Sequence, residues 1–242
     1  MTECVVFVSD DHAPYTDGDT FRTRLAAIKF LKPNVVVLGG DHVDFYQLSR
    51  FDKSPERIPQ LQDDIDAAYM LLKAYRKAAP GAKMVYLQGN HEERLQHYIH
   101  THAPALFGLR GLSVPKLLSL PDLGIQWEES GVWEYKGFVY KHGTTVRNKS
   151  SYSAAGEMDR FWASGMSGHT HRLGLHYKTS YKGTTKWIEA GCGCLPLDYI
   201  KQGPADWQQG FAYNISNGKH WFPQPVEIVN GMCMIHGQEV RF

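Results

Sequence analysis

The stretch VVVLGGDHVD, residues 35–44, contains the pattern on which the first half of this chain is built. Val35–Leu38 is a short apolar run, typical of a strand buried on both faces, as in a parallel sheet covered by helices. Gly39 and Gly40 follow, and because glycine has no Cβ they let the backbone adopt positive φ or approach another group closely. The turn would place the carboxylate of Asp41 at the end of the strand.

The same pattern occurs at Val5–Val8 and Met84–Leu87, and each of these apolar runs also ends in a polar motif. The segments 21–31 and 58–78 have apolar residues at helical spacing, so we expect helices there. Strands that alternate with helices form right-handed βαβ units, and ligands bind beyond the carboxyl ends of the strands in such sheets. Three motifs that are distant in the sequence should therefore meet in space.

The second half of the chain has a different pattern, which predicts a second sheet. Hairpins are expected at Val132–Tyr135 with Phe138–Lys141 and at Leu175–Tyr181 with Thr184–Glu189, with a helix at about 151–162 between them. The other expected elements are a helix at 92–102, a short helix near 114–118, and a β meander at 211–215, 219–222 and 226–235.

Composition leaves the substrate class open. The chain has 26 Lys and Arg against 25 Asp and Glu, so no overall positive field indicates a nucleic-acid partner, although a local basic groove is compatible with these numbers. The N-terminal apolar run is too short for a secretory signal, and no stretch approaches the roughly 20 apolar residues of a membrane span. We expect one domain over residues 1–242, with an irregular insertion at about 104–124.

Five polar motifs contain nearly every residue type that a two-metal hydrolytic centre needs. They are Asp10-Asp11-His12, Gly40-Asp41-His42-Val43-Asp44, Gly89-Asn90-His91-Glu92, Lys141-His142-Gly143 and Gly168-His169-Thr170-His171. A carboxylate and an imidazole such as Asp10 and His12 can hold one divalent ion, and Asp41 has oxygens on both sides with which to bridge two. The carboxylate of Asp44 could orient a histidine through the second nitrogen of its ring.

Asn90 offers a neutral amide oxygen for a second ion, whereas the adjacent His91 points another way and is free to give a proton to a leaving alkoxide. His142 ends an apolar strand, and His169 and His171 stand two apart on an extended segment, where both face one side. Three acidic or amide groups at early strand ends, combined with three histidines at later ones, favour a metal centre over unrelated surface or core residues.

The set D-x-H, G-D-x-x-D, G-N-H-E, H-G and G-H-T-H resembles the calcineurin-like metallophosphoesterase family, and it spans about two thirds of the chain. The resemblance implies an α/β fold with two mixed β-sheets packed as a sandwich and flanked by helices. It implies one divalent metal ion held by Asp10, His12, Asp41 and His171, and a second held by Asp41, Asn90, His142 and His169. It also implies that His91 is the general acid or contacts phosphate, with Asp44 supporting it.

Several positions depart from that pattern or allow another interpretation. Asp11 stands where the family usually has an apolar residue, and it is either exposed to solvent or adds negative charge near the metals. Lys141 would place a cation beside the site. Asn90 can also be read as a helix N-cap, with Glu93 as its partner three residues on, and this is compatible with a ligand role. Cys192-Gly193-Cys194 is interpreted as small residues packed under the second sheet.

The stretches 189–196 and 206–211 are similar to a subgroup common in bacteriophages and prophages. The four cysteines form no metal-type double pair. The expected compartment is therefore the cytoplasm of a bacterial or phage-infected cell.

The function that these residues favour is hydrolysis of a phosphate ester, in which a metal-bridging hydroxide attacks phosphorus in line and His91 assists the leaving oxygen. A phosphodiester from a nucleotide or a short nucleic acid is favoured, because an imidazole acid suits a poor alkoxide leaving group. The alternatives are a phosphomonoesterase or protein phosphatase, and a non-catalytic, metal-containing binding protein. Mn²⁺ is the expected metal, with Fe, Zn²⁺ or Ni²⁺ also compatible. Arg94 and Arg147 are candidate contacts to the substrate phosphate.

Overall fold

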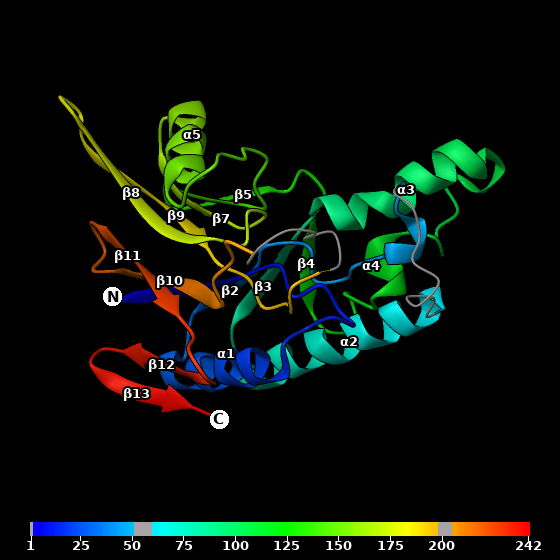
Figure 1. The fold of residues 1–242 in the computed structure, drawn as a ribbon, viewed down its shortest axis with the longest axis horizontal. Coiled ribbons are helices and arrows are strands. Elements are labelled where there is room, and N and C mark those ends of the chain that lie inside the picture. The colour runs from blue at the N-terminus through cyan, green and yellow to red at the C-terminus, as the bar shows by residue number, and fades with distance from the viewer. Residues whose placement is uncertain (1, 51–59, 198–204) are drawn as a thin grey trace.

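The computed structural model describes residues 2–50, 60–197 and 205–242. Two large mixed sheets pack face to face, with helices on both outer surfaces (Figure 1). Helices α1 (Gly18–Leu31) and α2 (Leu61–Ala78) cover the outer face of the first sheet, and α5 (Tyr152–Phe161) covers that of the second. The expected α/β sandwich is confirmed.

The first sheet has the strand order β11-β10-β1-β2-β3-β4. The strands β1 to β4 run parallel, and β10 and β11 add antiparallel strands at one edge. The bounds are β1 (Glu3–Val8), β2 (Val35–Leu38), β3 (Lys83–Leu87), β4 (Ile125–Glu128), β10 (Gly210–Ser216) and β11 (Trp221–Glu227). The three strands predicted from apolar runs are confirmed, whereas β4 was missed because it is a short edge strand with only its first residue buried.

The second sheet has the strand order β5-β6-β7-β9-β8. The bounds are β5 (Val132–Tyr135), β6 (Phe138–Lys141), β7 (Ser164–Ser167), β8 (Leu173–Ser180) and β9 (Gly183–Ala190). Both predicted hairpins are present, as β5 with β6 and β8 with β9. The central strand β7 reads SGMS, a sequence without apolar alternation, and its neighbours β6 and β9 run parallel to it.

The helices begin and end near their predicted positions. α1 begins earlier than expected because the carboxylate of Asp17 accepts a hydrogen bond from the N–H of Thr20 at 2.7 Å. The predicted start of α2 at residue 58 lies outside the described residues. The remaining helical elements are α3 (Asn90–His102), α4 (Val114–Leu117) and the 3₁₀ turns η1 (Tyr46–Leu48) and η2 (Pro104–Leu106).

The end of the chain differs from the predicted meander. One strand was expected over 226–235, but Asn230 and Gly231 adopt φ of 50° and 71°, and the chain turns there. Beyond the turn, β12 (Met232–Ile235) pairs with β13 (Gln238–Arg241) in a separate two-stranded sheet. The positive φ values interrupt the extended conformation that a continuous strand requires.

Each parallel strand of the first sheet contributes to two cores because its side chains alternate between faces. In β1, Val5 and Phe7 pack between the sheets with residues such as Tyr140. Val6 and Val8 pack on the other side, against α1 and α2. The carboxyl ends of these strands are thereby held at one edge of the sandwich, where the polar motifs follow.

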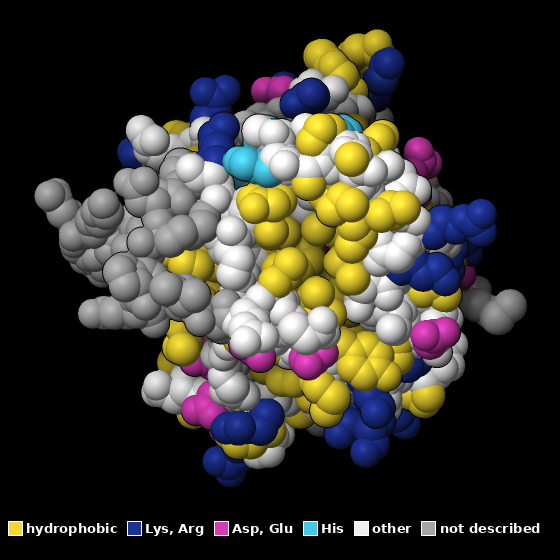
Figure 2. Space-filling view, turned by 90° about the vertical axis from the view of Figure 1, so that its right-hand side faces the viewer, with side chains coloured by type: hydrophobic (Ala, Val, Ile, Leu, Met, Phe, Trp, Pro, Cys, Tyr) yellow, Lys and Arg dark blue, Asp and Glu magenta, His cyan; other side chains and the backbone are white. Residues whose placement is uncertain are grey.

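The end of the molecule at the right of Figure 1 carries exposed apolar side chains. Figure 2 views this end, where the last turns of α3 and the segment after it lie, and hydrophobic side chains gather on it. Leu106, Phe107 and Leu109 are 44, 56 and 51 % exposed. Within the described residues, no helix has both the length and the apolar character needed to cross a bilayer.

The packing of α2 predicts a position-dependent effect on stability. Leu72 is fully buried, so we expect Leu72→Ala to lower the free energy of unfolding by about 2–5 kcal/mol through lost burial and a cavity. Met70 on the same helix is 60 % exposed, and Met70→Ala should change it by about 0.5 kcal/mol or less. Urea denaturation measures both, and equal losses would contradict this packing.

Candidate metal centre

The candidate site lies where the carboxyl ends of strands from both sheets meet. The first sheet supplies side chains from the segments that follow β1, β2 and β3, and the second supplies side chains from those that follow β6 and β7. The structure brings together all seven predicted ligands: Asp10, His12, Asp41, Asn90, His142, His169 and His171.

One half of the site is formed by Asp10, His12 and His171. The Nε2 atom of His171 lies 3.3 Å from Oδ1 of Asp10 and 3.1 Å from Nε2 of His12. All three residues are buried. Their donor atoms therefore point toward one small volume.

The other half is formed by Asn90, His142 and His169. His142 Nε2 lies 3.0 Å from Oδ1 of Asn90 and 3.3 Å from Oδ2 of Asp41. Nδ1 of His142 lies 2.9 Å from the carbonyl oxygen of Gly39, which suits an Nδ1–H donor and leaves the lone pair of Nε2 facing the site. This second hydrogen bond is the usual way in which a protein orients a metal-binding histidine.

Asp41 stands between the two halves. Its ligand atom lies within 4.8 Å of those of Asp10 and His12, and within the same distance of those of His142 and His169. Donor atoms about 2.0–2.2 Å from one ion lie roughly 3–4 Å apart, so both groups fit a divalent cation with modest side-chain movement. A carboxylate that belongs to both groups has the position required of a ligand that bridges two ions.

Asp41 brings a negative charge to the site, and His142 must lose a proton before its Nε2 can bind a cation. Burial acts to raise the pKa of Asp41, but His142 and His91 lower the pKa well below its usual value, so the carboxylate is ionised. Burial likewise acts to lower the pKa of His142, and Asp41 raises it to about 10. The pKa of His169 falls to about 4 because the ring is buried, and this ring is neutral at pH 7. A divalent cation would compete with protons for these lone pairs.

Five of the seven predicted ligands have left-handed backbone conformations, which non-glycine residues rarely adopt. The φ values are 56° for Asp10, 47° for His12, 54° for Asp41, 70° for His169 and 60° for His171. Such conformations cost on the order of 1–3 kcal/mol each and cluster at functional sites, where the surrounding structure enforces them. Here the loops support one another through backbone hydrogen bonds, such as the one from the N–H of His12 to the carbonyl of Asp41.

Glu92 holds the loop of Asp41 against the start of α3. Its carboxylate accepts hydrogen bonds from the backbone N–H groups of Asp41 at 2.9 Å, His42 at 3.0 Å and Gly89 at 2.9 Å, and from the hydroxyl of Tyr86 at 2.6 Å. The alternative interpretation of Asn90 as N-cap with Glu93 as partner is therefore wrong. The cap residue is Gly89, and Glu92 is its partner.

His91 lies beside Asp41 and Asp44. Its backbone N–H donates to Oδ1 of Asp41 at 2.9 Å, and its Nδ1 lies 2.9 Å from the carbonyl oxygen of Asp44. The carboxylate of Asp44 lies 3.4 Å from Nδ1 of His91 and 3.2 Å from Nδ1 of His12, so it contacts both rings. Arg94 donates to Nε2 of His91 at 2.9 Å and to the carbonyl oxygen of Asp44 at 2.8 Å.

Residues 5–191 match the calcineurin-like phosphoesterase family. The chain belongs to this family. It is a metal-dependent phosphoesterase, as the motifs predicted.

The relatives of this phosphoesterase include phage proteins, in agreement with the predicted subgroup. The gene 54 proteins of Mycobacterium phages L5 and D29 are each 30% identical to it, and the alignments cover 98% of both chains. Among solved structures, Vacuolar Protein Sorting 29 from Cryptosporidium parvum has a similar fold, with a TM-score of 0.51 and 14% identity over 100% of both chains.

Asp11, the departure from the family's pattern, is fully buried and is not exposed to solvent. Its carboxylate accepts hydrogen bonds from Arg24 at 2.7 Å and from the hydroxyl of Tyr75 at 3.0 Å, and it lies 2.7 Å from Nδ1 of His42. Arg24 also bonds to the carbonyl oxygens of Ser9 and Gly210. The phosphoesterase thus has a buried ion pair beneath the loop that carries Asp10 and His12, and no motif in the sequence indicated Arg24.

The other singled-out residues have different surroundings. Lys141 is buried beside the site, but its Nζ donates to Glu157 at 2.8 Å, so its charge is paired. Cys194 is buried with its Sγ 3.9 Å from Nδ1 of His171, behind a predicted ligand. Arg147 lies exposed on the loop between β6 and α5, and its contact with substrate stays a prediction.

The buried ion pair predicts a large effect on stability. Arg24→Met leaves the carboxylate of Asp11 buried without its counter-charge, and we expect the free energy of unfolding to fall by about 3–5 kcal/mol. Arg22, on the exposed side of α1, pairs with Asp19 at the surface. Arg22→Met should therefore lower the free energy of unfolding by about 0.5 kcal/mol or less. Denaturant unfolding of both variants checks this, and a mild loss for Arg24→Met would contradict it.

Proposed function

We propose that this phosphoesterase uses two divalent metal ions to hydrolyse phosphodiesters derived from nucleotides or short nucleic acids. The observation that carries the proposal is the position of Asp41, whose carboxylate belongs to two separate groups of possible metal ligands. Its phage relatives support a place of action in the cytoplasm of an infected bacterial cell.

The proposed ligand sets follow the two halves of the site. One ion would be held by Asp10, His12, Asp41 and His171, and the other by Asp41, Asn90, His142 and His169. Carboxylate, amide and imidazole groups in this mixture suit Mn²⁺. When bound, the ions would stabilise negative charge on the phosphate oxygens and lower the pKa of water.

The residues around His91 prepare it to act on the leaving oxygen. The carbonyl oxygen of Asp44 accepts a hydrogen bond from Nδ1–H and fixes the ring, so Nε2 is the atom that would carry the transferred proton. Nε2 of His91 accepts a hydrogen bond from Arg94 in this structure, and this hydrogen bond must break when the substrate binds. A phosphate oxygen is a strong acceptor for that guanidinium, which is how Arg94 would both bind the substrate and release His91.

Metal content tests the ligand assignment. After dialysis against Mn²⁺, we expect about two ions per wild-type chain and about one for Asn90→Ala, whereas Asp41→Ala should retain less than one because both sites lose a ligand. Asp159→Ala, which removes an exposed carboxylate on α5, is the matched control and should retain both ions. Elemental analysis measures the content, and full occupancy in Asp41→Ala would refute the shared carboxylate.

The role of His91 is tested by the leaving group. With Mn²⁺ present, we expect His91→Ala to lower kcat on a dinucleotide, whose leaving group is a poor alkoxide, by about 10²–10⁴-fold. A p-nitrophenyl diester should lose far less, because its leaving group needs little protonation. His97→Ala, an exposed histidine on the same helix, should leave both rates unchanged.

Other outcomes would identify the alternatives. Equal losses on both diesters would remove His91 from the role of acid. Turnover restricted to p-nitrophenyl phosphate, a monoester, would favour a phosphomonoesterase or protein phosphatase. A metal-loaded chain that hydrolyses neither class would favour a metal-containing binding protein.

A further inference from the structure

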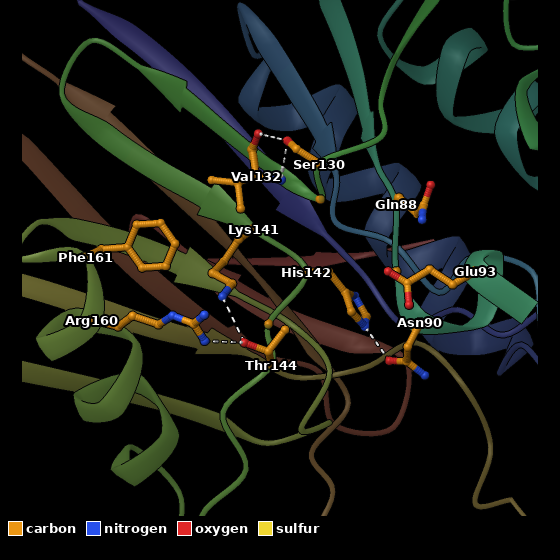
Figure 3. Close-up of a pocket in the computed structure, with 13 residues that line it drawn as sticks. Gln88, Asn90, Glu93, Ser130, Val132, Lys141, His142, Thr144, Arg160 and Phe161 are labelled. Atoms are coloured by element: carbon orange, nitrogen blue, oxygen red, sulfur yellow. Dashed lines mark hydrogen bonds between the residues drawn. The ribbon is translucent and has the colours of Figure 1, made fainter. Parts of the chain in front are cut away.

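A cavity of about 250 Å³ opens beside the candidate metal centre (Figure 3). Asn90 and His142 form its wall on the metal side, and the last turn of α5 forms the opposite wall with Arg160 and Phe161. Neither Arg160 nor Phe161 belongs to a family motif, and the sequence did not indicate them. The cavity thus lies next to the candidate metal centre and has no role in the mechanism proposed above.

The proposed acid does not line the cavity. Among the described residues, His91 and the groups around it, His12, Asp44 and Arg94, do not line it. In an in-line displacement the attacking and leaving oxygens lie on opposite sides of phosphorus, and the third ester substituent points sideways. Since the leaving group departs at His91 and His91 does not line the cavity, the cavity is free to receive the sideways-pointing substituent that stays attached.

The charges that line the cavity suit a neutral polar group better than a second phosphate. The ammonium of Lys141 is paired with Glu157, so it offers no net charge. Arg160 brings one positive charge to the lining of the cavity, and Glu93 on the opposite wall brings one negative charge. A second phosphate in this space would meet little excess positive charge and one nearby anion.

The shape and surfaces of the cavity suit a single base and sugar. Phe161 packs against Trp187, with 5.7 Å between ring centroids, and the Nζ of Lys141 lies 4.9 Å from the centroid of the Phe161 ring. Arg160 donates to Thr144 at 3.4 Å, a long bond that leaves its guanidinium able to turn toward a ligand. Bases stack on aromatic rings and on guanidinium planes. The volume of the cavity is slightly below the roughly 300–1,000 Å³ of pockets for drug-sized ligands, so the cavity suits one nucleoside and not an oligonucleotide.

We propose that this cavity binds the nucleoside that remains attached to phosphorus, with the base against Phe161 and Arg160. The proposal rests on the proposed function and adds a specificity for the non-leaving side of the diester. The amide of Gln88 and the carboxylate of Glu93 would pair with polar edges of the base or sugar.

Substrates with one leaving group and different retained groups test the proposal. We expect the Mn²⁺-loaded enzyme to prefer the p-nitrophenyl esters of thymidine 5′- or 3′-phosphate over methyl p-nitrophenyl phosphate by at least about tenfold in kcat/KM. Arg160→Ala and the volume-conserving Phe161→Leu should each reduce that ratio by about tenfold. Arg22→Ala, an exposed arginine on α1, should leave the ratio unchanged.

Binding provides a readout that is independent of turnover. Calorimetry should show that thymidine 5′- or 3′-phosphate, a product that keeps its nucleoside, binds at least about tenfold more tightly than methyl phosphate. Arg160→Ala should remove most of that difference. An equal affinity for the nucleoside and methyl compounds, or a difference that Arg160→Ala leaves intact, would overturn the proposal.

The two proposals fail in different ways. Hydrolysis of methyl p-nitrophenyl phosphate without any preference for the thymidine esters would refute the cavity assignment and leave the proposed function standing. Binding of a thymidine phosphate that depends on Arg160, in a chain that hydrolyses no diester, would refute the proposed function and support the cavity.

Discussion

The buried carboxylate of Glu92 is the contact on which the geometry of the site depends. It joins the turn after β2 to the first turn of α3 by accepting three backbone N–H groups and one hydroxyl. Glu92 therefore helps to place Asp41 and His91 relative to each other, together with the direct hydrogen bond from the N–H of His91 to Asp41, and its side chain is buried. Without it, buried N–H groups would lack acceptors, which costs about 1–3 kcal/mol each. The positions of Asp41 and His91 thus both depend on Glu92.

A second buried carboxylate, Asp11, supports the neighbouring loop in a comparable way. Its partners Arg24 and Tyr75 come from α1 and α2, so the helical layer is tied to the loop that carries Asp10 and His12. The left-handed conformations of the predicted ligands Asp10 and His12 lie in this supported loop. Strained loops persist when the surrounding structure enforces their conformation. Here the buried, hydrogen-bonded carboxylates of Glu92 and Asp11 form that structure.

Much of this architecture was predictable from local sequence. The apolar runs predicted β1, β2 and β3, and the motifs that follow them predicted which residues would meet. β4 and β7 were missed because short strands with few apolar residues resemble loops. Arg24 and Arg160 were missed for another reason: nothing near them in the sequence shows that Arg24 pairs with Asp11 or that Arg160 lines a cavity, because both depend on how α1 and α5 pack beside distant motifs. Asp11 drew attention as an unusual residue, but its burial depends on partners far along the chain.

The division of donors between the sheets has a consequence for the molecule as a whole. Carboxylate and amide oxygens come mainly from the first sheet, and three of the four imidazoles come from the second. Any ion that binds donors from both sheets links the two layers of the sandwich as a crosslink would. Binding to the native state alone stabilises it in proportion to RT ln(1 + [L]/Kd), so folding and metal loading share one equilibrium. The metal supply of the cell would then set how much folded protein persists as well as how much is active.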